Sequence, residues 1–385
     1  MKLKELKTVM LALLCAALIP AVSWALEAYP DVGYGRVDGY SAVGRRSGEF
    51  LSIPVSARSV GLGDAYTAVV DDISAIYYNP AGLAFLSKTE FQFTLVSLPA
   101  DVRYNYAAAA VPLADGQWVV GGFYGMLSMD PIEETTLLLP NGTGNQVDVY
   151  SQVLGGAVAY NFSDRFSVGI SVKHVYEDYW GVNAQAVAFD LGTNYHTEFL
   201  GRDFKLGLAI LNLGTDLKFT GSRLQTIVDP AEIPQEQEQS GYVNRDPRPQ
   251  RELEYRTYGY TLPTVFKIGA SMVMASSERA SWLVGLDLMQ PNNVPVSWAL
   301  GTEVSAIFSE DLTGAFRFGW RVQTDQDEDN LGGSDLYGGG TSARGLSFGG
   351  GLHRNFSMFN LGFDYAYRNM GHLSANQFFG FKVGF

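Results

Sequence analysis

The sequence predicts an all-β protein: a 14-stranded antiparallel transmembrane β-barrel over residues 89–385, with an N-terminal hatch over residues 26–88 whose short helices and turns plug the lumen. Between Thr89 and Phe385, fourteen segments of roughly nine to fourteen residues alternate with a period of two, as tilted membrane strands do. The last ten residues also alternate and end on an aromatic residue. That final strand must be paired on both edges, which a closed barrel achieves.

The N-terminus of the chain predicts its compartment. Three lysines precede an apolar run at 9–19, and Ser23 and Ala25 place small residues where a signal peptidase reads them. We therefore expect residues 1–25 to be a cleaved signal peptide and the mature protein to lie in the bacterial outer membrane. Cleavage removes three Lys and one Glu, which takes the net charge from −13 to −15 and argues against a nucleic-acid partner. Cleavage also removes Cys15, the only cysteine.

The strands that alternate most clearly define the two faces of the barrel wall. Four such segments are 166–173, 204–210, 315–322 and 360–368. Their large apolar residues would face lipid, and their small or charged residues would face the lumen. The predicted lumen face carries these charged residues: Lys173, Asp190, Lys205, Lys267, Asp287, Glu303, Arg317, Arg321, Asp364, Arg368 and Lys382.

Charges inside a barrel must be paired or hydrated, so cross-strand ion pairing is one interpretation of this set. The other is that its slight basic excess guides a carboxylate ligand such as a fatty acid. We expect acidic residues of the hatch to compensate part of that excess.

The connections between the predicted strands give an independent check. The long ones, 128–146, 214–261 and 323–342, are all odd-numbered, and the even-numbered ones are short. This is the pattern of a bacterial barrel whose short turns face the periplasm, whereas the alternative folds are a soluble β-sandwich or propeller. The loop at 214–261, rich in Pro, Gln and Glu, suggests mobility without a hydrophobic anchor, or protein binding. The acidic run 325–330 lacks the glycine and final glutamate of a calcium loop, so we expect no metal there.

Local signals in the hatch predict two helices. Asp64 can cap a helix over 65–70, and Asp71 or Asp72 can cap another over 73–78. The second helix would end at Asn79-Pro80, because a residue before proline is pushed out of the helical region.

The hatch also carries a motif of small, acidic and proline residues: Phe50-Leu51, Ala57-Arg58, Gly61-x-Gly63-x-Ala65, Ala68, Asp71-Asp72 and Ala75-x-Tyr77-x-Asn79-Pro80-Ala81-Gly82-Leu83-Ala84. Over residues 50–127 the chain resembles the PorV/PorQ outer-membrane proteins, which belong with the FadL-like fatty-acid channels. The resemblance implies a 14-stranded barrel. It also implies one of two functions, because the PorV branch serves type IX secretion and receives cargo proteins with a C-terminal sorting domain, whereas the FadL branch transports hydrophobic molecules.

Two functions therefore stay open. The first is a type IX secretion-associated, or related cell-surface export or attachment, component that binds secreted cargo and would show a closed lumen beneath a platform of outer loops. The alternative is a FadL-like channel for long-chain fatty acids or other hydrophobic solutes, with an apolar pocket above the hatch and a gap in the wall for lateral release. Hatch residues with a candidate role in packing, ligand contact or gating are Arg58, Gly61, Gly63, Asp71, Asp72, Asn79, Pro80, Ala81 and Gly82.

No catalytic or cofactor motif stands out in the sequence. None of the four histidines has a second His or a Cys at metal-ligand spacing, and no Gly-x-Ser-x-Gly motif occurs. We therefore predict a protein that is not an enzyme and needs no metal or other cofactor. Its expected general partners are outer-membrane lipids and the barrel-insertion machinery, for which the terminal Phe385 resembles the assembly signal.

Overall fold

The computed structural model describes residues 46–228, 251–294, 296–323, 345–370 and 375–385. The predicted signal peptide, the first part of the predicted hatch and the acidic run 325–330 lie outside these residues. No described helix is long and apolar enough to cross a membrane.

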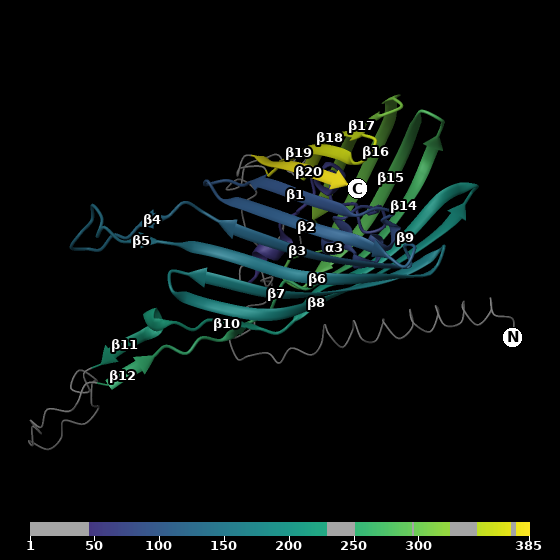
Figure 1. Cartoon of the computed structure of the whole chain (residues 1–385). Helices are drawn as coiled ribbons and strands as arrows, with labels where there is room; N and C mark the ends of the chain where they lie inside the picture. The colour runs from purple at the N-terminus through teal and green to yellow at the C-terminus, as the bar shows by residue number, and fades with distance from the viewer. Residues whose placement is uncertain (1–45, 229–250, 295, 324–344, 371–374) are drawn as a thin grey trace, which may run out of the picture. The chain divides into compact units, whose positions relative to one another are not determined.

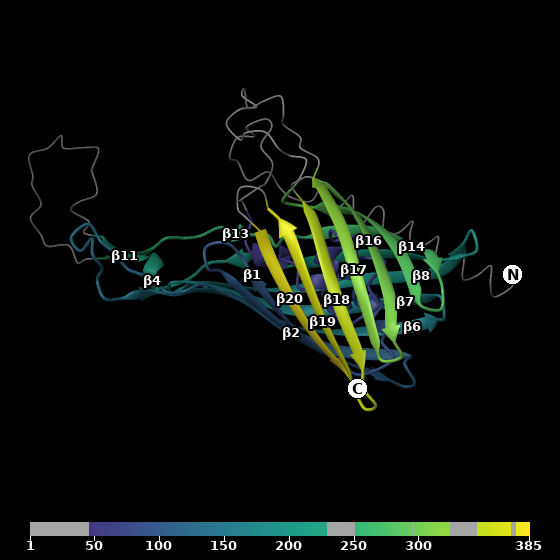
Figure 2. The same ribbon diagram turned by 90° about the horizontal axis from the view of Figure 1, so that it is seen from above.

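Fourteen antiparallel strands form a closed barrel in chain order (Figure 1). β1 pairs with β2 on one edge and with β20 on the other, so the first and last strands close the wall (Figure 2). The predicted fold class is therefore confirmed. The barrel strands are β1 (Glu90–Ser97), β2 (Arg103–Leu113), β3 (Trp118–Ser128), β6 (Val149–Ser163), β7 (Phe166–Tyr179), β8 (Val182–Phe199), β9 (Arg202–Gly214), β14 (Val265–Ser276), β15 (Ala280–Pro291), β16 (Ser297–Ser309), β17 (Leu312–Gln323), β18 (Leu346–Asn355), β19 (Asn360–Asn369) and β20 (Ala375–Gly384).

The alternation of each strand separates a lipid face from a lumen face. In β17, Phe316 and Phe318 are 65% and 46% exposed on the outside, whereas Arg317 between them is 2% exposed inside. Large apolar side chains cover the outside of the barrel, and small or charged ones line its interior. This division confirms the predicted faces of the four clearest segments.

The two ends of the barrel differ in the length of their connections. At the short-loop end, the strands are joined by two to four residues, from 114–117 to 356–359. The opposite, long-loop end carries three additional hairpin sheets and a 3₁₀ helix, labelled in part in Figure 1. These elements are β4 (Ile132–Glu133), β5 (Gln146–Val147), β10 (Leu217–Lys218), η3 (Ser222–Leu224), β11 (Gln225–Val228), β12 (Arg251–Glu254) and β13 (Gly259–Tyr260). The predicted parity of long and short connections is confirmed.

The expectation that the loop at 214–261 has no hydrophobic anchor is wrong for its described ends. Leu217 is fully buried, and the ring centroid of Phe219 lies 5.6 Å from that of Tyr179 on β7. The pairing of β10 with β13 holds both ends of the loop together and brings these apolar side chains against the wall. Its Pro- and Glu-rich residues 229–250 lie outside the described part of the chain.

Residues 46–88, here called the plug, lie in the lumen. Their elements are η1 (Glu49–Ser52), α2 (Ala57–Gly61), α3 (Ala75–Tyr78) and η2 (Pro80–Phe85). The predicted helix over 65–70 is wrong: this stretch forms turns, and Asp64 adopts a left-handed backbone with φ of 71°. The predicted helix over 73–78 is shorter than expected. Its end is as predicted, because Asn79 is extended and its side chain caps η2.

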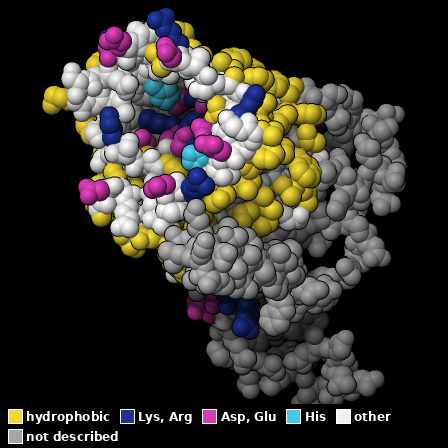
Figure 3. Space-filling model, turned by 90° about the vertical axis from the view of Figure 1, so that its right-hand side faces the viewer, with side chains coloured by type: hydrophobic (Ala, Val, Ile, Leu, Met, Phe, Trp, Pro, Cys, Tyr) yellow, Lys and Arg dark blue, Asp and Glu magenta, His cyan; other side chains and the backbone are white. Residues whose placement is uncertain are grey.

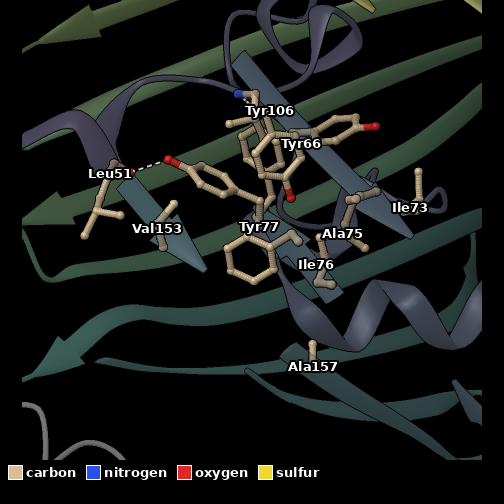
Figure 4. Packing of buried hydrophobic residues seen from close by; sticks show 14 of the residues in the cluster. Leu51, Tyr66, Ile73, Ala75, Ile76, Tyr77, Tyr106, Val153 and Ala157 are labelled. Atoms are coloured by element: carbon tan, nitrogen blue, oxygen red, sulfur yellow. Dashed lines mark hydrogen bonds between the residues drawn. The ribbon is translucent and has the colours of Figure 1, made fainter. Parts of the chain in front are cut away.

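The plug buries an aromatic core against one side of the barrel wall (Figure 4). The hydroxyl of Tyr77 donates to the backbone oxygen of Leu51 at 2.6 Å, and its ring packs edge-on against Tyr106 of β2. Ile76 and Tyr66 are fully buried in the same core. The plug thus buries its apolar side chains against the wall and gains hydrophobic stabilisation from it.

Deleting Phe385 is expected to remove most of the protein from the outer-membrane fraction. The backbone N–H of Phe385 donates to Thr89 at 2.9 Å, and its ring meets Phe91 of β1, so the residue fastens the closing edge of the barrel. Immunoblots of membrane fractions measure the effect. Phe199→Ala, which removes another exposed aromatic at the short-loop end, is the control and should leave the amount unchanged. Normal membrane levels of the deletion variant would contradict the assembly role.

Candidate functional site: the plug and its seat in the wall

Arg58 on α2 is the central cation between the plug and the wall. Its guanidinium binds Glu303 of β16 through two nitrogens at 2.9 and 3.0 Å, and binds Asp71 of the plug at 2.6 Å. Asp72 lies 3.5 Å away. The planar guanidinium suits this role because it offers several donors in a fixed fork. One largely buried side chain therefore connects two turns of the plug to the barrel.

A second layer of charges extends this contact across four strands. Arg317 of β17 binds Glu303 at 2.5 Å and Asp364 of β19 at 2.6 Å. Lys382 of β20 binds Asp72 at 2.5 Å and lies 3.6 Å from Asp364. Since every charge in this network has an opposite partner, the network can persist in a buried place. We call this set the latch: Arg58, Asp71, Asp72, Glu303, Arg317, Asp364 and Lys382.

Two carboxylates of the plug, those of Asp72 and Asp64, are ionised at neutral pH. Burial alone would raise the pKa of Asp72, but the charges of Lys382 and Arg58 outweigh it and hold the pKa well below its ordinary value. Asp64 behaves in the same way, because Arg368 at 2.9 Å and Arg321 at 3.1 Å offset its desolvation and lower its pKa. Both contributions to stability are present above the ordinary carboxyl pKa and are lost as the pH falls through the lowered values.

Polar groups of the wall also hold the backbone of the plug. A carboxylate oxygen of Asp287 on β15 accepts from the N–H groups of Tyr66 and Thr67 at 3.0 and 2.8 Å. The side-chain amide of Asn79 donates to Thr67 at 2.9 Å and to Thr193 of β8 at 3.1 Å. Asp287, rather than Asp64, thus accepts from the first N–H groups of the stretch 65–70. Polar groups of the plug and of the wall therefore satisfy one another's hydrogen bonds.

Seven consecutive strands place a lumen-facing glycine where the backbone of the plug touches the wall. A Cβ atom on Gly319 would lie 2.0 Å from the nitrogen of Gly63, and one on Gly169 would lie 2.2 Å from the carbonyl carbon of Pro80. Several of these glycines are direct cross-strand partners, such as Gly301 and Gly319. A side chain at any of them would push the plug out of its seat. We call this set the glycine girdle: Gly169, Gly192, Gly207, Gly269, Gly285, Gly301 and Gly319.

A cavity of about 140 Å³ lies between the plug and the long-loop end. Its lining combines the rings of Tyr77 and Tyr78 with three cations and two carboxylates: Lys173, Lys267, Arg321, Glu49 and Asp64. This lining differs from the apolar pocket expected above the hatch.

The cations of this cavity differ in their partners. Lys173 binds Asp190 at 2.8 Å, and Arg321 binds Asp64 at 3.1 Å. The ammonium of Lys267 lies 5.4 Å from the ring centre of Tyr78, and no carboxylate of the described residues lies within ion-pair distance of it. Lys267 is therefore the one of these three cations that makes no ion pair with a described carboxylate.

A second cavity, of about 230 Å³, lies at the short-loop end and is lined by latch residues and by His353. Charged side chains gather around a hollow on that side of the molecule (Figure 3). Between the two cavities the plug fills the lumen. The expected gap in the wall is absent from the described strands, since each barrel strand is hydrogen-bonded to both of its neighbours.

The eleven charged residues predicted for the lumen all lie inside the barrel, and the structure brings most of them to the plug. Among the predicted hatch residues, Arg58, Asp71 and Asp72 form the latch. Asn79, Pro80 and Gly63 face the glycine girdle. Gly82 and Ala81 pack within the plug or against β7, and Gly61 packs against Arg317. The glycine girdle was not predicted from the sequence, although glycine recurs at lumen-facing positions of the strands that alternate most clearly.

These features define a transmembrane β-barrel closed by a built-in plug. No protein-family model and no curated protein sequence matches the chain. Among solved structures, it is similar to the toluene transporter TodX of Pseudomonas putida, with 11% sequence identity and a TM-score of 0.51 over 90% of this chain and 98% of that chain. The toluene transporter TbuX of Ralstonia pickettii gives 13% and 0.49 over 85% and 96%, and a FadL homologue of Pseudomonas aeruginosa gives 11% and 0.44 over 86% and 98%. The likeness to TodX supports a common barrel fold, while the PorV/PorQ resemblance stays a prediction.

Proposed function

We propose that this protein is an outer-membrane channel for a hydrophobic solute that carries an anionic group, with the plug as its gate. The observation that carries the proposal is the cavity at the long-loop end, where Lys267 has no carboxylate partner among the described residues. With the orientation that the sequence predicts, this cavity faces the outside of the cell. The likeness in fold to a toluene transporter supports the transport of hydrophobic molecules.

The lining of the cavity favours an amphipathic anion over a plain hydrocarbon. Leu211, Val265 and Met289 supply apolar surface on one side, and Lys267 supplies a charge. A neutral hydrocarbon would leave that ammonium without a partner in a largely buried place, which is unfavourable. The cavity volume of about 140 Å³ suits the carboxylate of an amphipathic solute and a short part of the solute's chain. The rest of a longer solute would extend toward the long-loop end.

Passage requires the plug to move. The wall is closed along every described strand, and the plug separates the two cavities, so a solute reaches the short-loop end only when plug contacts break. The charges of the latch and of the Asp64 cluster suit such a role, because ion pairs can exchange partners as a carboxylate arrives. These hatch residues therefore act in gating, whereas the sequence alone allowed either packing or gating for them.

Replacing Lys267 with methionine is expected to weaken the binding of laurate about tenfold, because a hydrogen bond to a charged group contributes ~1.5 kcal/mol. Binding of 1-dodecanol, which has the same chain without the charge, should change little. Titration calorimetry on the purified protein in detergent measures both. Lys218→Met, which removes an exposed lysine of β10, is the matched control. Equal loss of laurate and dodecanol binding, or no loss of either, would contradict the role of Lys267.

A secretion-associated function is the second candidate, and the long-loop end favours it. Arg223 of η3 stacks on Trp180 and lies 4.0 Å from Glu134 beside β4, so separate loops join into one surface. Leu137 and Leu138 stand out from this surface, fully and 92% exposed. Such a surface, above a closed lumen, fits the capture of cargo proteins or of other secretion components.

A deletion strain assayed in parallel separates the two functions. Loss of fatty-acid uptake with normal secretion supports the channel. Loss of secreted proteins that bear type IX sorting domains, with normal uptake, supports the second candidate and leaves the channel proposal without a physiological role.

A further inference from the structure

The lipid face of the barrel contains an apolar groove across β16, β17, β18 and β19. It has a volume of about 510 Å³, and its lining includes Phe308, Phe316, Leu352 and Phe363. The groove opens onto the apolar band of the barrel, where the acyl chains of lipids surround the wall and can fill it.

The cause of the groove is a glycine on the lipid face. Gly350 of β18 is the direct cross-strand partner of Phe316 on one side and of Tyr365 on the other. The two rings rise beside a position that has no side chain. A Cβ atom added to Gly350 would meet nothing closer than Ala315 at 3.7 Å, so the space above it is open. In the glycine girdle, by contrast, the plug occupies the space.

Arg354 lies on the lipid face of the same strand as Gly350, nearer to the short-loop end. Gly350, Leu352 and Arg354 occupy successive lipid-facing positions of β18, and Arg354 is exposed. Its guanidinium stacks on Phe356 at 5.0 Å, and no carboxylate of the described residues pairs with it. From Gly350 to Arg354 the strand advances roughly 13 Å, which is about 10 Å along the membrane normal for a strand tilted by ~40°, so both positions lie within one leaflet and its head-group boundary.

We propose that this groove binds one glycerophospholipid, with an acyl chain over Gly350 and the phosphate on Arg354. The apolar lining matches an acyl chain, and the guanidinium, which pairs with no carboxylate of the described residues, matches the phosphate. In the orientation that the sequence predicts, Arg354 faces the periplasmic leaflet, where phospholipids are found. The site lies outside the lumen and is independent of the proposed transport.

The test uses the full mature chain in bilayer nanodiscs that contain a phospholipid with a photoreactive group near the end of its acyl chain. Labelled peptides are identified by mass spectrometry. The peptides that carry Phe316 and Gly350 should be labelled about tenfold more than those of β3 on another part of the wall, which corresponds to about 1.4 kcal/mol. Gly350→Leu should abolish this preference, because the new side chain fills the groove. Gly122→Leu, at a lipid-facing glycine of β3 whose surroundings are also open, should not.

The head-group contact has its own variant. Arg354→Gln should lower the retention of phosphatidylglycerol in native mass spectra about fivefold, as expected for loss of one charge-assisted contact. Arg165→Gln, at another turn of the short-loop end, should leave the retention unchanged. Heat-modifiable migration in gels confirms that each variant is folded. Even labelling around the barrel, or cross-links from the groove to a second copy of the chain, would overturn the proposal.

Discussion

An Arg58→Met variant is expected to conduct through an open lumen where the wild type stays closed. Methionine keeps the apolar stem of the side chain and removes the cation that Glu303, Asp71 and Asp72 share. Removing one partner of a buried ion pair costs ~3–5 kcal/mol where the remaining charge is left alone; here Glu303 keeps Arg317 and Asp72 keeps Lys382, so the carboxylates lose part of their compensation. Repulsion among these carboxylates should then drive the plug away from β16. Single-channel recordings in planar bilayers measure the open lumen directly.

The matched control for this variant is Arg103→Met. Arg103 also binds a carboxylate at 2.7 Å, but both partners are more than 60% exposed, so this surface pair should contribute little. Its conductance should equal that of the wild type. If folded Arg58→Met barrels stay as closed as the wild type, the latch does not hold the plug. If the wild type itself shows a wide and permanently open pore, the plug model is wrong as a whole.

A Gly319→Val variant is expected to keep a folded barrel and lose the seating of the plug. The Cβ atom alone would overlap the backbone of Gly63, and backbone atoms on both sides cannot yield as a flexible side chain would. Overpacking of this kind costs ~1–3 kcal/mol in ordinary cores and more where the backbone must shift. Limited trypsin digestion, with cleavage after Arg58 followed by mass spectrometry, reports whether the plug has left its buried position.

Gly122→Val provides the comparison for this variant. Gly122 lies on the lipid face of β3, and a Cβ atom there would approach nothing closer than Gly155 at 3.6 Å. Both changes add the same side chain to a strand, so any effect of valine on strand pairing is common to them. Faster cleavage at Arg58 in Gly319→Val alone supports the girdle. Equal protection of Arg58 in both variants would show that the plug does not depend on glycine at this position.

The barrel was predictable because the physical constraint behind it is periodic. A wall with lipid on one side and a packed lumen on the other forces alternation on each strand, as Phe316, Arg317 and Phe318 illustrate. The parity of loop lengths added a second constraint that a wrong strand count would have broken. Both signals are local in sequence, so they could be read without knowing which residues meet in space.

The plug was less predictable because its structure depends on the wall. Asp64 has the sequence position of a helix cap, yet Arg321 and Arg368 draw its carboxylate to β17 and β19. The stretch after it forms turns whose N–H groups bind Asp287 of β15. Contacts with residues more than 200 positions away in the sequence therefore outweigh the local helix propensity of this stretch. The groove over Gly350 was hidden for a similar reason, because it depends on which residues lie beside that glycine on neighbouring strands.

The contact between Lys382 and Asp72 joins a residue near the start of the described chain to one near its end, so the two residues are synthesised far apart in time. Asp72 leaves the ribosome early, and Lys382 belongs to the last strand of the barrel. The same strand closes the wall against β1, which follows the plug directly. β20 therefore contributes both to the closure of the wall and to the latch that holds the plug. A chain that stops before β20 would lose its closing strand and this contact of the plug together.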